Sequence, residues 1–133
     1  KWDYQTQGAW ALQTGTANDL RVYVASSLSE AGGNYTESTD NSLKSGVWQH
    51  VVFVYDGSLA AASRAVIYLD GVSKSLTITG TIPTSMQNSS ATSKIGKFGG
   101  SLTRYFNGSI DEIRIYNRVL TATEIQTLYN VGR

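Results

Sequence analysis

The sequence predicts an all-β fold in which two antiparallel sheets pack as a sandwich, followed by a short C-terminal helix. About eight short runs of alternating apolar and polar residues are separated by polar turns, a spacing that is typical of sandwiches. Eight tyrosines, three tryptophans and 13 glycines against a single proline also fit many strands joined by polar loops. The last part of the chain, from Tyr105 to Tyr129, has the clearest boundaries and predicts a strand, a turn and a helix.

The first half of the chain predicts four strands. Period-two alternation places three of them at Ala9–Gln13, Leu20–Ala25 and Asn34–Ser38. Val47–Asp56 is apolar on both faces, which predicts a central strand covered on both sides. We expect the aromatic side chains inside the strands to lie in the core, namely Trp48, Phe53, Tyr55 and Tyr68.

The second half contains the clearest hairpin. Ala65–Leu69 and Val72–Thr79 flank Asp70-Gly71, a pair that favours the tight turn between antiparallel strands. Gly80–Thr92 is expected to be a long polar loop, and Ser93–Phe98 a short strand. A further strand is predicted around Ile110–Ile115, which alternates and is rich in β-branched residues.

Three local signals agree on the start of the helix. Thr121 is a suitable N-cap, and Glu124 three residues later completes a capping box. Leu120 and Ile125 occupy the positions of a hydrophobic staple. The helix is therefore predicted to begin directly after Thr121.

Three blocks carry a family resemblance: SGVWQHVVFVYDG, VIYLDG and FNGSIDEIRIYNRVLTATEIQTLY. In order and spacing they closely resemble the laminin-G-like (concanavalin A-like lectin/glucanase) jelly-roll superfamily, from roughly Ala9 to Tyr129. The resemblance implies a jelly-roll sandwich of an extracellular kind, secreted or on the cell surface, which often binds carbohydrate with a structural calcium ion.

Length, charge and composition limit the number of domains and the classes of partner that we expect for this chain. The 133 residues predict a single domain over 1–133, long enough to bury a core. A net charge of +1 with 16% charged residues gives no footprint for nucleic acid. No apolar run is long enough to insert into a membrane, and the absence of cysteine excludes disulfides.

Relatives in this family usually have several strands before the point that matches Lys1, so we expect the chain to lack their N-terminal strands. A sheet edge with unpaired backbone groups would then be open. A separate chain could supply the missing strands, a partner could pair with the edge, or the fold could have dispensed with them. We favour a homodimer or a missing fragment over a shortened fold.

Catalysis is not expected. Glucanases of the superfamily carry an E-x-D-x-x-E pattern, which Ser109 to Arg114 matches only at Asp111. Retaining hydrolysis needs two carboxyl groups about 5–5.5 Å apart, whereas Asp111 and Glu112 would point to opposite faces of a strand. His50 is the only histidine and lies in an apolar strand, where a packing role is favoured over a Ser–His–Asp triad.

Two kinds of binding site are expected. The resemblance implies Asp111 as a ligand of a structural Ca²⁺, with a backbone hydrogen-bonding role as the alternative. Carbohydrate would need exposed aromatic rings beside polar groups, and the best candidates lie near Tyr35 and in the loop that contains Arg104, Tyr105 and Asn107.

The leading hypothesis is therefore a non-catalytic carbohydrate-binding or adhesion module, supported by calcium, whose partner is a carbohydrate or a protein. The main alternative is a protein–protein or structural module that uses an open sheet edge. The third is a degenerate domain of the glycoside hydrolase type, disfavoured by the missing pair of acids.

Overall fold

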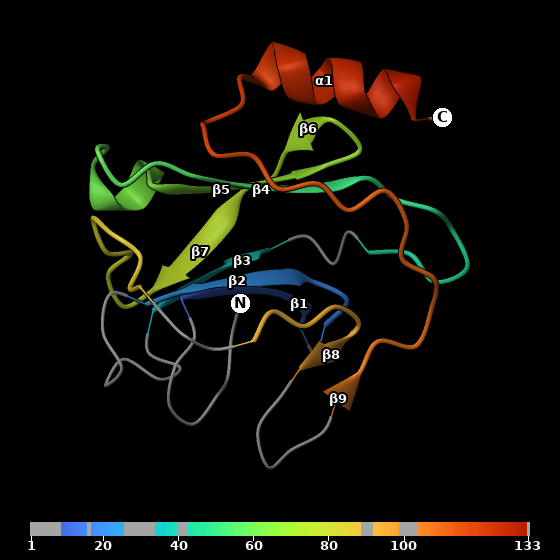
Figure 1. Ribbon diagram of the computed structural model, residues 1–133, viewed down its shortest axis with the longest axis horizontal. Coiled ribbons are helices and arrows are strands. Elements are labelled where there is room, and N and C mark those ends of the chain that lie inside the picture. The colour runs from blue at the N-terminus through green and yellow to red at the C-terminus, as the bar shows by residue number, and fades with distance from the viewer. Residues whose placement is uncertain are drawn as a thin grey trace.

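The structure is a computed structural model that describes residues 9–15, 17–25, 34–39, 43–88, 92–98 and 104–132. Within these ranges two antiparallel sheets stack face to face, and a helix lies on the outer side of one of them (Figure 1). The predicted all-β sandwich with a C-terminal helix is confirmed. The single-domain organisation over 1–133 stays a prediction.

One sheet has four strands in the order β1-β2-β3-β7, and the other has three in the order β4-β5-β6. The four-stranded sheet contains β1 (Trp10–Thr14), β2 (Leu20–Val24), β3 (Tyr35–Ser38) and β7 (Leu76–Thr79). The three-stranded sheet contains β4 (Val51–Tyr55), β5 (Ala65–Leu69) and β6 (Val72–Ser73). The remaining elements are a 3₁₀ turn, a two-stranded hairpin and the helix: η1 (Ala61–Ser63), β8 (Lys97–Phe98), β9 (Arg104–Tyr105) and α1 (Ala122–Val131).

The β5–β6 hairpin turns at Asp70-Gly71 as predicted. Both residues have positive φ angles, 52° and 79°, which is the geometry that the right-handed twist of a hairpin requires. The predicted second strand, Val72–Thr79, is nevertheless divided between the two sheets. After the Lys74 amide bonds to the Ile67 carbonyl (2.9 Å), the chain crosses over and β7 pairs with β3.

The prediction of a central strand over Val47–Asp56 is wrong. The strand covers only Val51–Tyr55, and among the described strands β4 pairs with β5 alone, so it lies at an edge of its sheet. Trp48 was expected in the core but is 67% exposed. It precedes the strand, and no ladder with a second strand holds it against the core.

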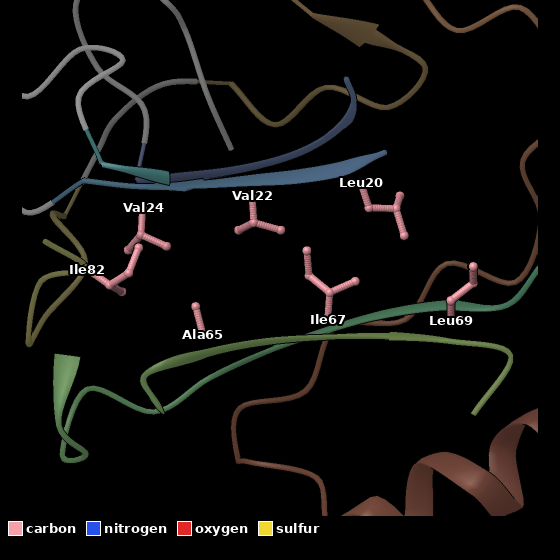
Figure 2. Close-up of a cluster of buried hydrophobic side chains, with 7 residues drawn as sticks. All are labelled: Leu20, Val22, Val24, Ala65, Ile67, Leu69 and Ile82. Atoms are coloured by element: carbon pink, nitrogen blue, oxygen red, sulfur yellow. The ribbon is translucent and has the colours of Figure 1, made fainter. Parts of the chain in front are cut away.

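The core lies between the two sheets, as Figure 2 shows. The core consists of side chains from β2 and β5 and of one side chain from a loop. These residues are Leu20, Val22, Val24, Ala65, Ile67, Leu69 and Ile82. Ile82 comes from the loop that was expected to be polar, yet it is completely buried. That loop is held by the Tyr55 hydroxyl, which donates to the Pro83 carbonyl (2.7 Å), and by Arg64, which donates to the Ile82 carbonyl (2.6 Å).

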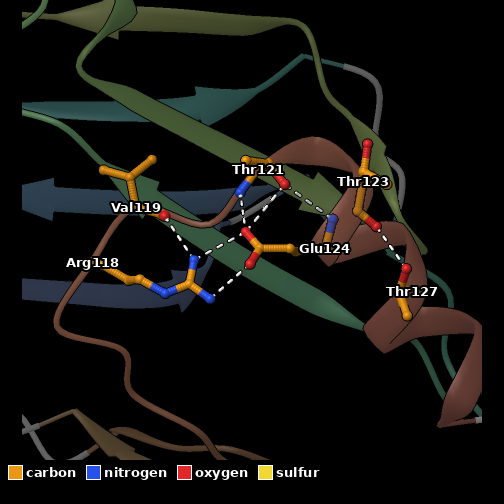
Figure 3. A network of polar contacts seen from close by, with 6 residues as sticks. All are labelled: Arg118, Val119, Thr121, Thr123, Glu124 and Thr127. Carbon is orange, nitrogen blue, oxygen red and sulfur yellow. Dashed lines mark hydrogen bonds and ion pairs between the residues drawn. The ribbon is translucent and has the colours of Figure 1, made fainter.

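Figure 3 shows the predicted capping box of α1. The Glu124 amide donates to the Thr121 hydroxyl (3.2 Å), and the Thr121 amide donates to the Glu124 carboxylate (2.8 Å). Leu120 and Ile125 are both buried, as the staple predicts. The guanidinium of Arg118, followed by the Thr121 amide, lowers the pKa of Glu124 to about 2.

The strand predicted around Ile110–Ile115 does not form. From Phe106 to Val119 the chain is irregular, and every side chain in this stretch is exposed. A strand is stable only when a neighbour accepts its backbone hydrogen bonds. Within the described ranges no strand pairs with this stretch, so its alternating pattern has no ladder to join.

Candidate functional site

The outer face of the four-stranded sheet carries an ordered set of polar and aromatic side chains. Arg21 and Tyr23 of β2 lie opposite Glu37 and Tyr35 of β3 in the strand register. Neighbouring positions such as Val22 point into the core, and side chains alternate along a strand, so these four point away from the core. We call Arg21, Tyr23, Tyr35 and Glu37 the sheet-face cluster.

Direct contacts hold this cluster together. Arg21 Nε donates to Glu37 Oε2 (2.8 Å), and the terminal nitrogen of Arg21 also contacts that oxygen. The Arg21 guanidinium lies 4.6 Å from the centre of the Tyr35 ring. The Tyr23 and Tyr35 rings are 5.2 Å apart between centroids and tilted by 42°. The cluster is therefore a fixed arrangement of two rings and one ion pair.

The charge on Arg21 is secure in this setting. Burial alone would lower the pKa of Arg21, but its hydrogen bonds to Tyr23 and Glu37 outweigh that effect and raise it. The cluster thus presents a permanently charged donor, a carboxylate acceptor and two phenol groups on one half-buried surface.

The β8–β9 hairpin supplies a more exposed ring. Figures 1 and 2 place β8 on the side of the four-stranded sheet that faces away from β4 and β5, which is the side of the sheet-face cluster. Lys97 and Tyr105 are cross-strand partners in this hairpin, and the Lys97 ammonium lies 5.4 Å from the centre of the Tyr105 ring. Tyr105 is 68% exposed. It is the most open aromatic ring on this side among the residues described.

The predicted ligand-binding residues are thus found in two groups. Tyr35 belongs to the sheet-face cluster, whereas Tyr105 and the exposed Asn107 belong to the hairpin and the turn after it. The backbone of Arg104 pairs with Phe98, and its side chain lies outside the described part of the structure. The sequence did not indicate the other members of the two groups, which are Arg21, Tyr23, Glu37 and Lys97.

Asp111, the expected calcium ligand, is exposed. Its carboxylate accepts the amide of Glu112 (2.8 Å), which is the backbone role considered as the alternative. Among the residues that the structure describes, there is no cluster of three or more aspartate, glutamate, histidine or cysteine side chains that could bind a metal ion. Calcium prefers six to eight oxygen ligands. Calcium binding by Asp111 stays a prediction.

A catalytic triad around His50 does not assemble from the described residues. The Nδ1 atom of His50 is buried and has no hydrogen-bond partner among them. The Asp70 carboxylate accepts the backbone amide of His50 (2.9 Å) and not its imidazole. A serine–histidine–aspartate relay needs the carboxylate on the imidazole itself.

Comparison with known families gives a clear result. A sequence model of the Laminin_G_3 family, described as the concanavalin A-like lectin/glucanases superfamily, matches residues 2–126. The chain belongs to this superfamily. The observed sandwich is accordingly a jelly-roll sandwich of the laminin G-like kind, as the resemblance implied.

Other comparisons are weaker. No curated protein matches the chain. One solved structure, residues 221–444 of an S-layer domain-containing protein from Clostridium thermocellum ATCC 27405, is 22% identical, with a TM-score of 0.48. The match covers 84% of this chain and 51% of that one, so the chain spans about half the length of that structure.

Membership in the superfamily supports a carbohydrate-binding or adhesion type of module in general terms. The laminin G-like members of the superfamily are generally non-catalytic. Among the described residues, no helix has the length and hydrophobicity needed to cross a bilayer.

Proposed function

We propose that this chain is a non-catalytic carbohydrate-binding module that is secreted or displayed at the cell surface. The observation that carries the proposal is the open Tyr105 ring with the Lys97 ammonium beside it, on the same side of the molecule as the sheet-face cluster. Superfamily membership supports the same class of function.

Sugar recognition has two physical requirements, and this side of the molecule offers both. An exposed ring packs against the apolar C–H face of a pyranose, which is a contact that water does not make well. Charged and amide groups around the ring then bind the hydroxyl groups. Tyr105 would provide the stacking surface, while Lys97 and Asn107 in the hairpin region provide polar groups.

The sheet-face cluster would provide a second set of partners. Arg21 and Glu37 already bind each other, so both side chains are held in place before a ligand arrives. Such preorganisation lowers the entropy cost of binding. The exposed hydroxyl or carboxylate groups of a sugar chain that extends from Tyr105 along the sheet would meet this pair.

A glycan array followed by calorimetry with the best ligand tests the proposal. Tyr105→Ala should weaken binding by about tenfold or more, corresponding to about 1.4 kcal/mol for the lost stacking. Trp48→Ala is the matched control because Trp48 is equally exposed, at 67% against 68%, but precedes β4 of the other sheet. Equal loss in both variants, or no glycan bound by the wild type, would refute the proposal.

A protein-binding or adhesion role is the second candidate. The observation that favours it is the stretch of exposed apolar side chains between Ile110 and Tyr116. A module of this kind would bind its partner equally well with Tyr105→Ala, and would lose binding when Ile113 or Ile115 is replaced by a charged residue.

A further inference from the structure

The only Asn-Gly pair of the chain lies directly after the β8–β9 hairpin. Asn107 and Gly108 are both exposed, and they follow Tyr105 by two and three residues. The residue between, Phe106, is tied to the hairpin because its amide donates to the Gly96 carbonyl (2.9 Å). Asparagine is a chemically labile residue, and the residue that follows it decides how labile it is.

Packing favours glycine at position 108. A Cβ atom there would lie 2.8 Å from Cε1 of Phe106, so a larger residue would displace that ring. Glycine has no Cβ atom and reaches backbone conformations that other residues avoid. For the same two reasons the backbone nitrogen of Gly108 is poorly shielded and can approach the side chain of Asn107. The pair therefore brings a reactive side-chain amide and an accessible backbone nitrogen together on the surface.

We propose that Asn107 is a site of spontaneous deamidation, and that this modification regulates the proposed sugar-binding surface. The nitrogen of Gly108, after losing its proton to base, attacks the side-chain carbonyl carbon of Asn107. The new C–N bond closes a five-membered succinimide ring, and the side-chain nitrogen takes a proton from water and leaves as ammonia. Water then adds to one of the two ring carbonyl carbons and opens the ring to aspartate or isoaspartate. The sum is hydrolysis of one amide, with water as the only co-reactant.

Two other asparagines are protected by their surroundings. The side-chain oxygen of Asn34 accepts the Thr81 amide (3.0 Å), and that of Asn130 accepts from the Gln126 side chain (3.3 Å). Each precedes a residue with a larger side chain, which covers the attacking nitrogen. Asn130 also lies in α1, where helical hydrogen bonding occupies the backbone nitrogen of the next residue. We expect both to keep their amides.

Asn117 is the matched comparison for Asn107. It is equally exposed and also lies in an irregular part of the chain, but it precedes Arg118. The Arg118 side chain is held by an ion pair with Glu124 (2.7 Å), and its Cβ atom shields its own backbone nitrogen. A difference in rate between the two asparagines therefore reports the effect of Gly108 and not that of exposure.

The effect on binding rests on the proposed function. The amide of Asn107 offers two donors and an acceptor to sugar hydroxyl groups, whereas a carboxylate only accepts. The new negative charge also lies two residues from Tyr105, the cross-strand partner of Lys97, so it attracts the ammonium group that the sugar would use. Isoaspartate adds a methylene group to the backbone directly after the hairpin. Both products should therefore weaken sugar binding.

Peptide mass spectrometry tests the chemistry without any ligand. The folded chain is incubated at mildly alkaline pH, and samples are digested beside a sample that was not incubated. Cleavage after Arg104, Arg114 and Arg118 places Asn107 and Asn117 in separate peptides. The Asn107 peptide should gain the mass difference between an amide and an acid many times faster than the Asn117 peptide, and faster as the pH rises. Equal rates for the two asparagines, or a rate at Asn107 that does not rise with pH, would overturn the proposal.

Calorimetry on the separated forms tests the regulation. Ion-exchange chromatography separates the deamidated chain by its additional negative charge, and both forms are titrated with the glycan that the wild type binds best. The deamidated form should bind about two- to tenfold more weakly, as expected for one lost hydrogen bond. Asn107→Gln is the control for ageing, because the larger ring that glutamine must close forms much more slowly. Its affinity should be the same before and after incubation.

The two measurements separate this proposal from the function on which it rests. Equal affinity of the intact and deamidated forms would overturn the regulation. A wild type that binds no glycan would refute the proposed function and the effect on binding with it. The rates at Asn107 and Asn117 would still decide whether Asn107 is a modification site.

Discussion

The imidazole of His50 stacks on the ring of Tyr129, with ring centroids 6.0 Å apart. This contact joins the residue before β4 to the second half of α1. The backbone of His50 is also tied to the hairpin turn, because its amide donates to the Asp70 carboxylate (2.9 Å) and its carbonyl accepts the Asp70 amide (2.8 Å). His50 thus lies where the helix, the sheet edge and the hairpin meet.

The first prediction concerns pH. Burial of the imidazole lowers the pKa of His50 below its usual 6.5, helped by the charge of Arg114 and opposed by Asp70. Because the folded state binds this proton less readily than the unfolded state, the stability linked to His50 is present above pH 6.5 and is lost as the pH falls through the folded-state pKa.

Urea denaturation on both sides of pH 6.5 measures this effect. The free energy of unfolding of the wild type should decrease on acidification more than that of His50→Gln, which carries no titrating group at this position. If the two proteins lose stability in parallel, His50 is not responsible. A wild type that becomes more stable on acidification would contradict the sign.

Local sequence signals predicted those parts of the fold that local geometry decides. Asp70-Gly71 adopts the two positive φ angles of a tight hairpin turn, and Thr121 with Glu124 satisfies the backbone groups at the start of the helix. The signals failed where the structure of a segment depends on which strand it pairs with. The run Val72–Thr79 alternates like one strand, but it leaves β5 after two residues to pair with β3. The pattern shows which residues can pair, not with which strand.

In the candidate site, too, the sequence indicated the features that depend on local sequence but not those that depend on strand pairing. Tyr35 and Tyr105 could be selected because they are aromatic residues beside polar loops. The Arg21–Glu37 pair could not, because the contact between these side chains depends on the β2–β3 register, which the alternation of each strand does not determine. Alternation with Val22 did indicate that Arg21 points away from the core, and this was the one available signal.

The second prediction concerns the hairpin turn. Gly71→Ala should destabilise the protein by about 1–2 kcal/mol, because Gly71 has a φ angle of 79° that is unfavourable for alanine. The new Cβ would also lie 2.7 Å from the Gln126 side-chain oxygen on α1. Gly46→Ala is the control, since φ is 74° there but no atom lies within 4 Å of the new Cβ.

Comparing the two melting curves separates the backbone strain from the contact with the helix. Gly71→Ala should lose more stability than Gly46→Ala, and the double variant Gly71→Ala/Gln126→Ala should regain part of the difference. An alanine at Gly71 that costs no more than one at Gly46 would mean that Gln126 moves aside freely.

The third prediction concerns Ile82. Its side chain is fully buried between the sheets although it comes from a loop, so Ile82→Ala should reduce the free energy of unfolding by about 2–5 kcal/mol. Ile115→Ala removes the same atoms from a surface position and should change stability by no more than about 0.5 kcal/mol. Similar values for the two would show that the loop does not close the core in solution.

The last prediction concerns calcium. The carboxylate of Asp111 accepts the Glu112 amide and is otherwise exposed, so bound Ca²⁺ at Asp111, as the family resemblance implies, should raise the melting temperature above its value in chelator. Asp111→Asn is the informative variant because the amide oxygen can still accept the Glu112 amide while the charge is lost. The rise should be absent in Asp111→Asn, and an equal melting temperature of the wild type in calcium and in chelator would contradict the prediction. A ligand that binds only the folded state raises the melting temperature when its concentration exceeds its Kd, so this measurement detects a calcium site whose Kd is below the calcium concentration used.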